Sequence, residues 1–475
     1  MGEIRYVDCR VLIHDNSLAT YAEAKYGRYV REDASLEDRM ILPDELAHRT
    51  IERIRSWIET SDQCGRDDLI LLGEHLYRLL FHGKIGEEFK SSYELFSRDA
   101  LENEDLRLRL TLVFYKEADR LATYPWEFLY KPGAGFLAGQ KTNLILTRFV
   151  PESIVVENLR PELEQLRILV AYSSPPELGT IDADEDVSRI EALTGDDISV
   201  QVERDLWRGD LKDAIETFKP HVFHFIGHGE AGRIALFADE KELQLRTLKS
   251  DKSMADWCDS ETVSDLFSNH RPRLVFLHAC RGAASFSRSL ESFTSMAREL
   301  VYRDIPAVIG MQFAIANEDA SVFAEAFYRE LAKGSPVDEA VSVGRRKLGS
   351  LARGGAWADP RFGNPLVYLQ ASKPMIVARV HEEPEPETQP EAQAMEAHEC
   401  PAPECYQRIK PGMLSCPKCR TRILRCDKGH PVAADWSHCP YCDTPLRTMR
   451  PVASVEPASV SAESSATAVA SIRGN

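Results

Sequence analysis

The sequence predicts an α/β fold in which helices flank a mostly parallel sheet. Four short runs rich in Val, Ile, Leu and Phe have the composition of strands buried on both faces. They lie at residues 166–172, 221–227, 273–279 and 306–313. Helical stretches follow at residues 210–218, 287–302, 319–333 and 337–351. Strands that alternate with helices are typical of an open sheet covered on both sides.

The first 150 residues mix helical and strand patterns. Residues 42–59 and 67–81 have the periodicity of amphipathic helices. Residues 106–115 alternate between polar and apolar side chains, as a half-buried strand does. The segments YPWEFLYKP and NLILTRFV, which follow, are predicted to be strands or the approaches to strands.

Length and charge limit the classes of function. A chain of 475 residues is long enough for two to four domains. Its net charge of −17 argues against nucleic acid or an anionic membrane as the main partner of the large domain. We find no apolar run long enough to span a membrane and no signal sequence at the N-terminus, and therefore expect a cytoplasmic protein.

Cysteine usage sets the C-terminal part of the chain apart. Four of the 11 cysteines are scattered before residue 399, and the others crowd between Cys400 and Cys442. Dense cysteines in a cytosolic chain indicate metal binding rather than disulfides. Two C-P-x-C turns each present two thiolates to one ion, and four such ligands make a tetrahedral structural zinc site.

We therefore expect two structural zinc ions. The first is assigned to Cys400, Cys405, Cys416 and Cys419, and the second to Cys426, His430, Cys439 and Cys442. His438 and His398 are spare imidazoles that could replace one of these ligands. The region resembles a double zinc ribbon. Basic residues gather within it, among them Lys410, Lys418, Arg420, Arg422 and Arg425, so a nucleic-acid contact is an alternative to the protein-docking role that we favour.

Two reactive residues follow predicted strands in the central region. His228 follows one strand within VFHFIGHGE, and Cys280 follows another within LVFLHACRG. Chemistry gathers at the carboxyl ends of strands in open α/β sheets, so neighbouring strands would bring the two side chains together. A histidine at this place can act as the base that a thiol needs to become a nucleophile. The HACRG motif follows the histidine at about the 50-residue spacing of the caspase signature.

Other interpretations of these residues were weighed. A lone cysteine or histidine at a strand end is often a core residue. The GHGEAG segment also fits G-x-G-x-x-G, but a strand-like sequence, RIALF, follows it where a dinucleotide-binding loop needs a helix. The joint His–Cys pattern therefore favours a catalytic pair.

Residues 106–369 resemble the CHAT family of caspase-like proteases, relatives of separase. The segments that carry the resemblance are YPWEFLY, LRILVAYSSP, VFHFIGHGE, LVFLHACRGAAS, IPAVIGMQF, SVFAEAFYREL and GSPVDEAV, in the order of the family. The resemblance implies a caspase-like sheet, with His228 as general base and Cys280 as nucleophile. It also implies an oxyanion hole made by the backbone N–H groups of Gly229 and Cys280. Some relatives are released by a partner and act in bacterial defence.

The pocket for the substrate is less well defined by the sequence. Caspases have a glutamine two residues before the cysteine, whereas this chain has His278, so specificity for aspartate is not expected. Many relatives prefer Arg or Lys, and Asp182, Asp184 or Asp319 could supply the negative charge. Carboxylates that only favour a helix N-terminus are the alternative for each. His278, which takes the place of that glutamine, is a further pocket candidate, although both it and His224 are otherwise expected to be core or support residues.

We expect five regions along the chain. They are an N-terminal part of the CHAT region at 1–160, which by family analogy is a pseudo-protease half; a caspase-like catalytic domain at 161–372; an acidic, Pro-rich linker at 373–398; the double zinc ribbon at 399–447; and a disordered tail at 448–475. The predicted function is a cysteine endopeptidase that cleaves a protein substrate and is regulated by a partner at the ribbons. A catalytically silent CHAT scaffold, or a ribbon adaptor that binds protein or nucleic acid, is the alternative.

Overall fold

The computed structural model divides the chain into two compact units, Met1–His381 and Glu382–Asn475. In the first unit it describes residues 4–15, 20–26, 35–39, 45–60, 64–115, 118–140, 143–151, 165–230, 232–248, 253–279, 290–313, 317–352, 354–370 and 374–377. In the second unit it describes residues 398–402, 405, 407–409, 415–426, 430–433, 437–439 and 445. Cys280, most of the predicted linker and the whole predicted tail lie outside these residues.

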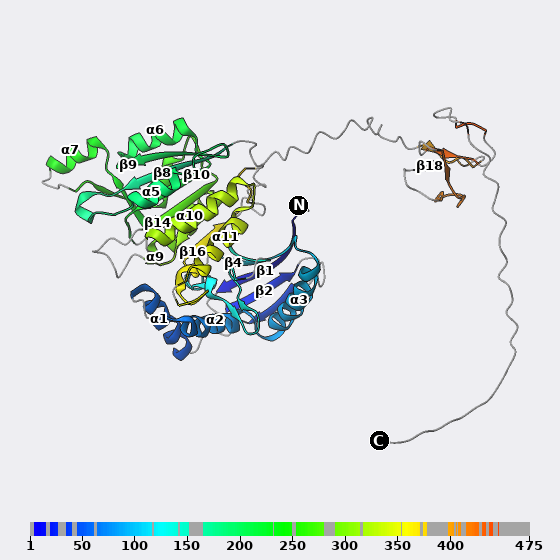
Figure 1. The fold of residues 1–475 in the computed structure, drawn as a ribbon, viewed down its shortest axis with the longest axis horizontal. Coiled ribbons are helices and arrows are strands. Elements are labelled where there is room, and N and C mark those ends of the chain that lie inside the picture. The colour runs from blue at the N-terminus through cyan, green and yellow to red at the C-terminus, as the bar shows by residue number, and fades with distance from the viewer. Residues whose placement is uncertain are drawn as a thin grey trace, which may run out of the picture. The chain divides into compact units, whose positions relative to one another are not determined.

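The first unit is built on one 11-stranded sheet (Figure 1). In spatial order its strands are β3 (Ser35–Arg39), β2 (Thr20–Tyr26), β1 (Arg5–Asp15), β4 (Leu106–Phe114), β7 (Leu144–Phe149), β16 (Pro365–Leu369), β15 (Ala307–Met311), β14 (Leu274–Ala279), β10 (Val222–Gly227), β8 (Leu166–Ser173) and β9 (Ile198–Arg204). Neighbouring strands are parallel except at β3–β2, β2–β1 and β16–β15. The predicted α/β fold with a mostly parallel sheet is confirmed.

Helices cover both faces of this sheet. They are α1 (Glu45–Thr60), α2 (Arg66–Leu80), α3 (Gly83–Glu102), α4 (Asp119–Ala122), α5 (Asp184–Glu191), α6 (Arg208–Phe218), α7 (Glu240–Leu248), α8 (Ser260–Leu266), α9 (Leu290–Tyr302), α10 (Asn317–Ala332) and α11 (Val337–Ser350). Short 3-10 helices are η2 (Trp126–Phe128), η3 (Pro176–Leu178) and η4 (Pro360–Gly363).

The side chains of β10 show how the two faces are divided. Val222 and Ile226 belong to the core that includes α5, α10 and α11, and Phe223 and Phe225 belong to the core that includes α6, α8 and α9. Successive side chains of a strand point to opposite faces, so apolar residues on both faces, with His224 as the one buried polar residue between them, fit a strand buried on both sides.

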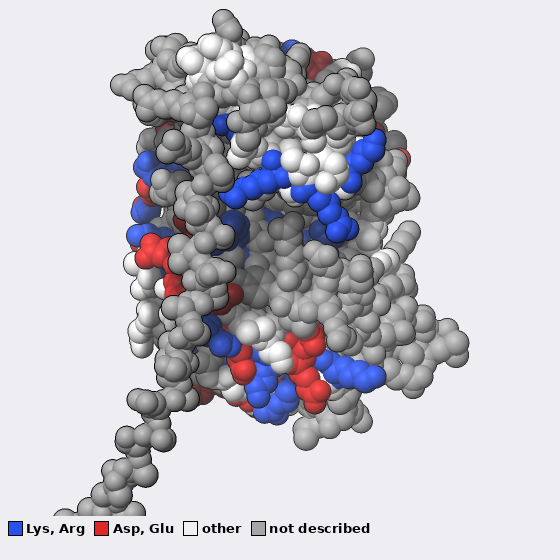
Figure 2. Space-filling model, turned by 90° about the vertical axis from the view of Figure 1, so that its right-hand side faces the viewer, with Lys and Arg blue, Asp and Glu red and all other residues white. Residues whose placement is uncertain are grey.

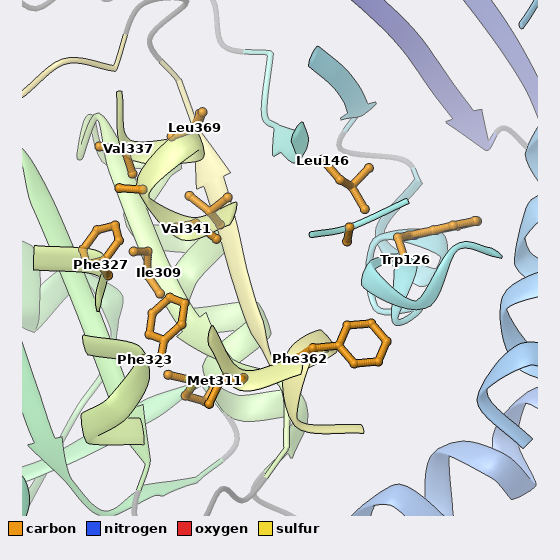
Figure 3. Packing of buried hydrophobic residues seen from close by; sticks show 14 of the residues in the cluster. Trp126, Leu146, Ile309, Met311, Phe323, Phe327, Val337, Val341, Phe362 and Leu369 are labelled. Carbon is orange, nitrogen blue, oxygen red and sulfur yellow. The ribbon is translucent and has the colours of Figure 1, made fainter. Parts of the chain in front are cut away.

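The α10 helix packs closely on the sheet. Figure 3 shows Phe323 and Phe327 of α10 pointing toward Ile309 of β15. The rings of Phe323 and Phe327 are stacked with centroids 5.8 Å apart, and both side chains are fully buried. This packing fixes α10 directly beneath the strands that lead to the candidate site.

A buried ionic cluster joins the N-terminal strands to the rest of the sheet. Glu127 accepts hydrogen bonds from both Arg148 of β7 and Gln312, and Arg345 of α11 lies 3.6 Å away. Burial lowers the pKa of Arg345 to about 10, whereas Glu127 holds the pKa of Arg148 above its ordinary value despite burial. The cluster provides the charge compensation that buried guanidinium groups require.

Two predictions for the N-terminal region need correction or refinement. The segment YPWEFLYKP was predicted to be a strand or the approach to one; Trp126–Phe128 form the 3-10 helix η2, and Tyr130–Lys131 then form the short strand β5. Pro125 begins this helix, and the indole N–H of Trp126 donates to the carbonyl of Leu121 at 2.7 Å. The helix α3, with its long amphipathic pattern, was not predicted.

Short antiparallel strands lie outside the main sheet. In the first unit, β11 (Gly229–Glu230), β12 (Arg233–Phe237) and β13 (Ala255–Cys258) form a three-stranded sheet directly after β10, and β5 (Tyr130–Lys131) pairs with β6 (Gly135–Phe136). In the second unit, β17 (His398–Glu399) pairs with β18 (Arg408–Ile409), and β19 (Leu424–Arg425) pairs with β20 (Pro431–Val432). The strand β12 occupies the place where a dinucleotide-binding loop would need a helix.

Candidate active site and metal-binding groups

His228 lies at the carboxyl end of β10, directly after Gly227. A side chain at position 227 would collide with the ring of Phe225 and come within 2.9 Å of the carbonyl oxygen of Ser173, so glycine is required there. The His228 side chain is 6 % exposed. The close approach of β10 to β8 thus holds His228 at the carboxyl end of β10.

Cys280 lies outside the described residues, but the strand that leads to it is described. Gly227 of β10 pairs in register with Ala279 of β14, and the two strands are parallel neighbours. Gly227 and Ala279 are the residues directly before His228 and Cys280. Adjacent strands are about 4.8 Å apart, and the register therefore places the two chain segments side by side where they leave the sheet.

Among the described residues, the imidazole of His228 has one hydrogen-bond partner. Its Nε2 lies 2.9 Å from the carbonyl oxygen of Gly179. A carbonyl oxygen accepts hydrogen bonds and cannot donate them, so Nε2 carries the proton. In the neutral ring Nδ1 is then left with a free lone pair, which is the arrangement a general base needs.

Gly179 is set in this position by its backbone. Its φ of 90° and ψ of 157° lie in a region that is essentially confined to glycine. It ends the η3 turn, in which the N–H of Gly179 donates to the carbonyl of Pro176 at 3.3 Å. Sequence analysis did not identify Gly179; the P-P-E-L-G turn after the first strand of the α/β region was the available signal.

The backbone N–H of Gly229 is directed away from β12. Gly229 pairs with Ile234, and the N–H of Ala235 donates to the carbonyl of His228 at 3.0 Å. In an antiparallel ladder this pattern makes Gly229 and Ile234 a pair without mutual hydrogen bonds. The N–H predicted to serve an oxyanion is therefore not consumed by the neighbouring strand.

The acidic stretch after β8 divides into exposed and buried carboxylates. Asp182 and Asp184 are exposed, and Asp184 pairs with Arg204 at 2.8 Å. Asp186, which was not singled out from the sequence, is 1 % exposed. Its spacing to Val187 and Ile190 on the buried face of α5 was the available signal.

Burial gives Asp186 unusual acid–base properties. Desolvation raises the pKa of its carboxyl group to about 7, and the hydroxyl of Ser321 on α10 opposes the shift. Neither carboxylate oxygen makes a hydrogen bond of ordinary geometry to a residue that the structure describes. The group is therefore partly neutral near physiological pH.

His278 and His224 lie under α10 and not at the surface of the site. His278 is 1 % exposed, and burial lowers its pKa to about 4. His224 stacks on Phe276 with centroids 4.3 Å apart, and its Nδ1 lies 2.9 Å from the hydroxyl of Tyr328. Burial also lowers the pKa of His224 well below its ordinary value. Burial therefore favours the neutral form of both imidazoles.

Asp319, the remaining pocket candidate, forms an ion pair. Its carboxylate accepts a hydrogen bond from Arg361 at 2.6 Å, and both side chains are largely buried. Burial raises the pKa of Asp319, and Arg361 opposes that shift. The same guanidinium also binds Asp359. The charge of Asp319 is thus already compensated within the protein.

The cysteines described in the first unit are buried thiols. Burial raises the pKa of Cys64 and of Cys258 to about 12, and raises that of Cys9 even further. Such thiols remain protonated and are poor nucleophiles at neutral pH.

The second unit brings two groups of potential metal ligands together. The first consists of Cys400, Cys405, Cys416 and Cys419, whose sulfur atoms lie within 4.8 Å of one another. Two of the sulfur–sulfur distances are 3.6 and 3.7 Å. The edge of a tetrahedron with metal–sulfur bonds of about 2.3 Å is about 3.8 Å long, so the four thiols fit a single ion.

The second group consists of Cys426, His430 and Cys439. Nδ1 of His430 lies 3.5 Å from the sulfur of Cys426 and 3.7 Å from that of Cys439. Cys442, the fourth predicted ligand, lies outside the described residues. His438, the spare imidazole, is exposed and has its Nδ1 3.2 Å from the hydroxyl of Ser437. Both groups could hold metal ions.

The surface and the helices give two further facts. Basic and acidic side chains are both present on the described part of the face in Figure 2. Among the described residues there is no helix of the length and apolar character needed to cross a membrane.

Comparisons with known proteins place this architecture in a family. No curated protein matches the chain. Crystal structures of the Saccharomyces cerevisiae separase–securin complex are similar, with TM-scores of 0.43 and 0.41 and sequence identities of 12 % and 13 %. Each of these matches covers 76 % of this chain but 30 % of the other, so this chain spans less than a third of the length of either. The family model described as the CHAT domain matches residues 71–362, more than half of the sequence. The chain belongs to the CHAT domain family.

Proposed function

We propose that the chain is a caspase-like cysteine endopeptidase with His228 as general base and Cys280 as nucleophile. The observation that carries the proposal is the hydrogen bond from Nε2 of His228 to the carbonyl of Gly179, which leaves Nδ1 free as a base. The register of Gly227 with Ala279 supports the pairing, because the catalytic residues directly follow these two.

The proposed reaction proceeds through an acyl-enzyme. Nδ1 of His228 takes the proton of the Cys280 thiol, and the thiolate attacks the carbonyl carbon of the scissile peptide bond. The backbone N–H groups of Gly229 and Cys280 stabilise the oxyanion. The imidazolium then protonates the leaving amine, and a water molecule, activated by the same histidine, hydrolyses the thioester.

The acid–base properties of the other thiols support the choice of nucleophile. Cys9, Cys64 and Cys258 are buried, and the pKa of each is raised. Cys280 follows a strand end beside a histidine, where a neighbouring base can take up the thiol proton.

For the substrate pocket we propose that a carboxylate near the end of β8 favours Arg or Lys in the substrate. Asp182 and Asp184 are both exposed on this segment and remain candidates. Asp184 and Asp319 are engaged by Arg204 and Arg361, and His278 is buried. Asp186 adds a second carboxyl group on the same segment, and its burial would strengthen an interaction with a cation that reached it.

We propose that both ligand groups of the second unit hold structural zinc, with Cys442 completing the second site. Soft thiolates in a tetrahedral set favour zinc. Bound zinc would hold together a region that has few large apolar residues to form a core. The ribbons would dock a regulatory protein, and a role in bacterial defence is the context that the family resemblance suggested. Reduced thiols and zinc thiolates fit a cytoplasmic location.

The proposal is tested by digesting a proteome-derived peptide library and reading the cuts by mass spectrometry. Wild type should cut after a defined residue, and Cys280→Ala and His228→Ala should each lower cleavage at least 100-fold, because each removes one half of the dyad. Cys258→Ala is the matched control and should retain cleavage. Equal cleavage by the Cys280→Ala variant would exclude the dyad.

A scaffold without catalytic activity is the second candidate. It is favoured if neither wild type nor variants cut the library, even after addition of a cell extract that could supply an activating partner. Salt-sensitive binding of nucleic acid by the zinc-loaded chain, lost on charge reversal of the exposed residues Lys418, Arg420 and Arg422, would favour a nucleic-acid adaptor.

A further inference from the structure

We propose that Glu177 is a positioning residue that fixes the tautomer of His228 by anchoring the loop that carries Gly179. This inference rests on the proposed function for its catalytic consequence. The inference rests on a closed series of hydrogen bonds and strand pairings that links Glu177, the small sheet β11–β13, His228 and Gly179.

The loop between β8 and α5 is fixed at both ends. The N–H of Ser174 donates to Asp205 at 2.9 Å, and the N–H of Ile181 donates to the hydroxyl oxygen of Ser174 at 3.2 Å. The hydroxyl of Tyr172 donates to the carbonyl of Ile181 at 2.7 Å. Between these ends the η3 turn projects outward, and it carries Glu177 and Gly179.

Glu177 binds this turn to the start of β13. One oxygen of its carboxylate accepts hydrogen bonds from the hydroxyl of Ser253 at 2.8 Å and from the N–H groups of Met254 and Ala255, each at 2.6 Å. Although burial opposes the effect, these donors lower the pKa of Glu177. Hydrogen bonds to an ionised carboxylate are roughly twice as strong as neutral ones.

The strand that receives Glu177 also leads back to His228. β13 pairs with β12, and β12 pairs with β11, which begins at the residue after His228. The N–H of Ala235 on β12 donates to the carbonyl of His228 at 3.0 Å. The small sheet therefore fixes the main chain of His228 directly, and fixes its imidazole through Glu177 and Gly179.

The start of β13, to which Glu177 binds, is held in place by further contacts. Arg246 of α7 donates to the carbonyl of Ala255 at 2.7 Å and pairs with Asp256 at 3.6 Å. The start of β13 is thus a firm anchor, and the single exposed carboxylate of Glu177 connects the loop to it. The hydroxyl of Ser174 also donates to the Gly179 carbonyl, at the long distance of 3.4 Å, but Ser174 belongs to the same loop. Without the Glu177 carboxylate the loop would shift, the Gly179 carbonyl would move away from Nε2, and the tautomer with the proton on Nδ1 would become populated. In that tautomer Nδ1 already carries a proton and cannot accept the proton of the Cys280 thiol.

Two measurements on the full chain test the proposal. The tautomer of His228 is read at pH 8 by long-range proton–nitrogen NMR of histidine-labelled protein, with His228→Ala identifying the signals. The reactivity of Cys280 is read by the rate of alkylation with iodoacetamide between pH 5 and 9. In that reaction the thiolate forms a C–S bond as the C–I bond breaks and iodide leaves, while the thiol proton resides on His228.

We expect Glu177→Ala to move the His228 signals toward those of mixed tautomers and to slow alkylation at pH 7 about tenfold. Glu177→Gln keeps one acceptor oxygen and should lie between wild type and Glu177→Ala. The matched control is Glu216→Ala, which removes a partly exposed carboxylate that accepts a hydrogen bond from Asn269 at 2.6 Å. It should behave as wild type.

The outcomes separate this inference from the proposed dyad. If Glu177→Ala and Glu216→Ala give the same His228 signals, the positioning role is wrong, whatever the activity of Cys280. A tautomer change without slower alkylation would overturn the catalytic consequence. If His228→Ala alkylates as fast as wild type, the dyad fails, but the NMR comparison still decides whether Glu177 positions the histidine.

Discussion

At the scale of single residues, the partner of the His228 imidazole among the described residues is a glycine carbonyl and not an acidic side chain. The Gly179 oxygen accepts the Nε2–H of His228, and its backbone has a φ of 90°. An L-residue adopts that conformation only with strain of about 1–3 kcal/mol. Backbone geometry at position 179 and the acid–base state of His228 should therefore be coupled.

Gly179→Ala tests that coupling. We expect it to lower the rate of peptide cleavage at least tenfold, because strain relief would displace the carbonyl from Nε2. The matched control is Gly133→Ala, where φ is 79° and an added Cβ also meets open space. Both variants should lose similar stability in urea, and equal cleavage rates in the two would contradict the assignment.

Asp186 gives a prediction for stability against pH. Its folded pKa of about 7 lies above its ordinary value of 3.8. The group therefore contributes stability that is fully present below pH 4 and is lost as pH rises through 7. Asp186→Asn cannot ionise, and its free energy of unfolding should rise relative to wild type by about 2 kcal/mol between pH 5 and pH 8.

Urea unfolding at the two pH values measures this difference. Any constant cost of the buried amide cancels, because it is the same at both pH values. Asp184→Asn, at an exposed carboxylate on the same helix, should show little change. A pH-independent difference between Asp186→Asn and wild type would mean that Asp186 is ionised throughout.

At the scale of elements, Glu127 is the point where η2, β7 and α11 meet. It compensates the charge of Arg148 and Arg345 in a region with at most 1 % exposure. Glu127→Ala leaves two guanidinium groups without a carboxylate and should destabilise the first unit by about 3–5 kcal/mol in urea unfolding. Glu74→Ala removes the exposed pair with Arg78 and should cost less than about 1 kcal/mol. Similar losses in the two would contradict a structural role for the cluster.

The elements also show where sequence patterns were sufficient. The runs that became β8, β10, β14 and β15 are apolar at consecutive positions because both faces of each strand are covered, and this made them recognisable. The short strands β11, β12 and β13 were not predicted as a sheet. The RIALF sequence of β12 was recognised as strand-like, and β11 pairs with β12 as a hairpin. The third strand, β13, joins β12 from 18 to 24 residues further along the chain, which local patterns do not encode.

The site shows the same limit. His228 could be predicted because a glycine-flanked histidine after a buried strand is a local pattern. Gly179 and Glu177 could not, because their roles depend on a loop meeting His228 and Ala255 from far along the chain. Asp186 resembles its exposed neighbours Asp182 and Asp184 in sequence, and only the packing of α5 on α10 distinguishes it.

At the scale of the whole molecule, β16 connects the two parts of the large sheet. It pairs antiparallel with β15 and parallel with β7, so the strands on the β7 side and those on the β15 side join through the last strand of the first unit. We therefore expect the first unit to unfold as one cooperative body, although its sequence suggested an N-terminal part and a catalytic domain.

The second unit should depend on metal instead. Removing metal with a chelator should abolish hydrogen-exchange protection in residues 398–445 and leave residues 165–230 protected, because few apolar residues hold the ligand groups together. Cys416→Ser should have the same effect on the four-cysteine group without a chelator. Protection that persists after metal content has fallen to zero would show that the unit folds without it.

The Gly179 carbonyl also affects the free energy of transferring the thiol proton to His228 in the proposed reaction, because that transfer creates a thiolate and an imidazolium. Nε2 holds its proton whether the ring is neutral or cationic, so the bond to Gly179 needs no donor to become an acceptor and no group to rotate. When the imidazolium forms, the same bond simply becomes charge-assisted and stronger. When the thiolate–imidazolium pair of the proposed reaction forms, the Gly179 carbonyl dipole already points at the imidazolium. The reorganisation energy on that side of the imidazole is therefore small.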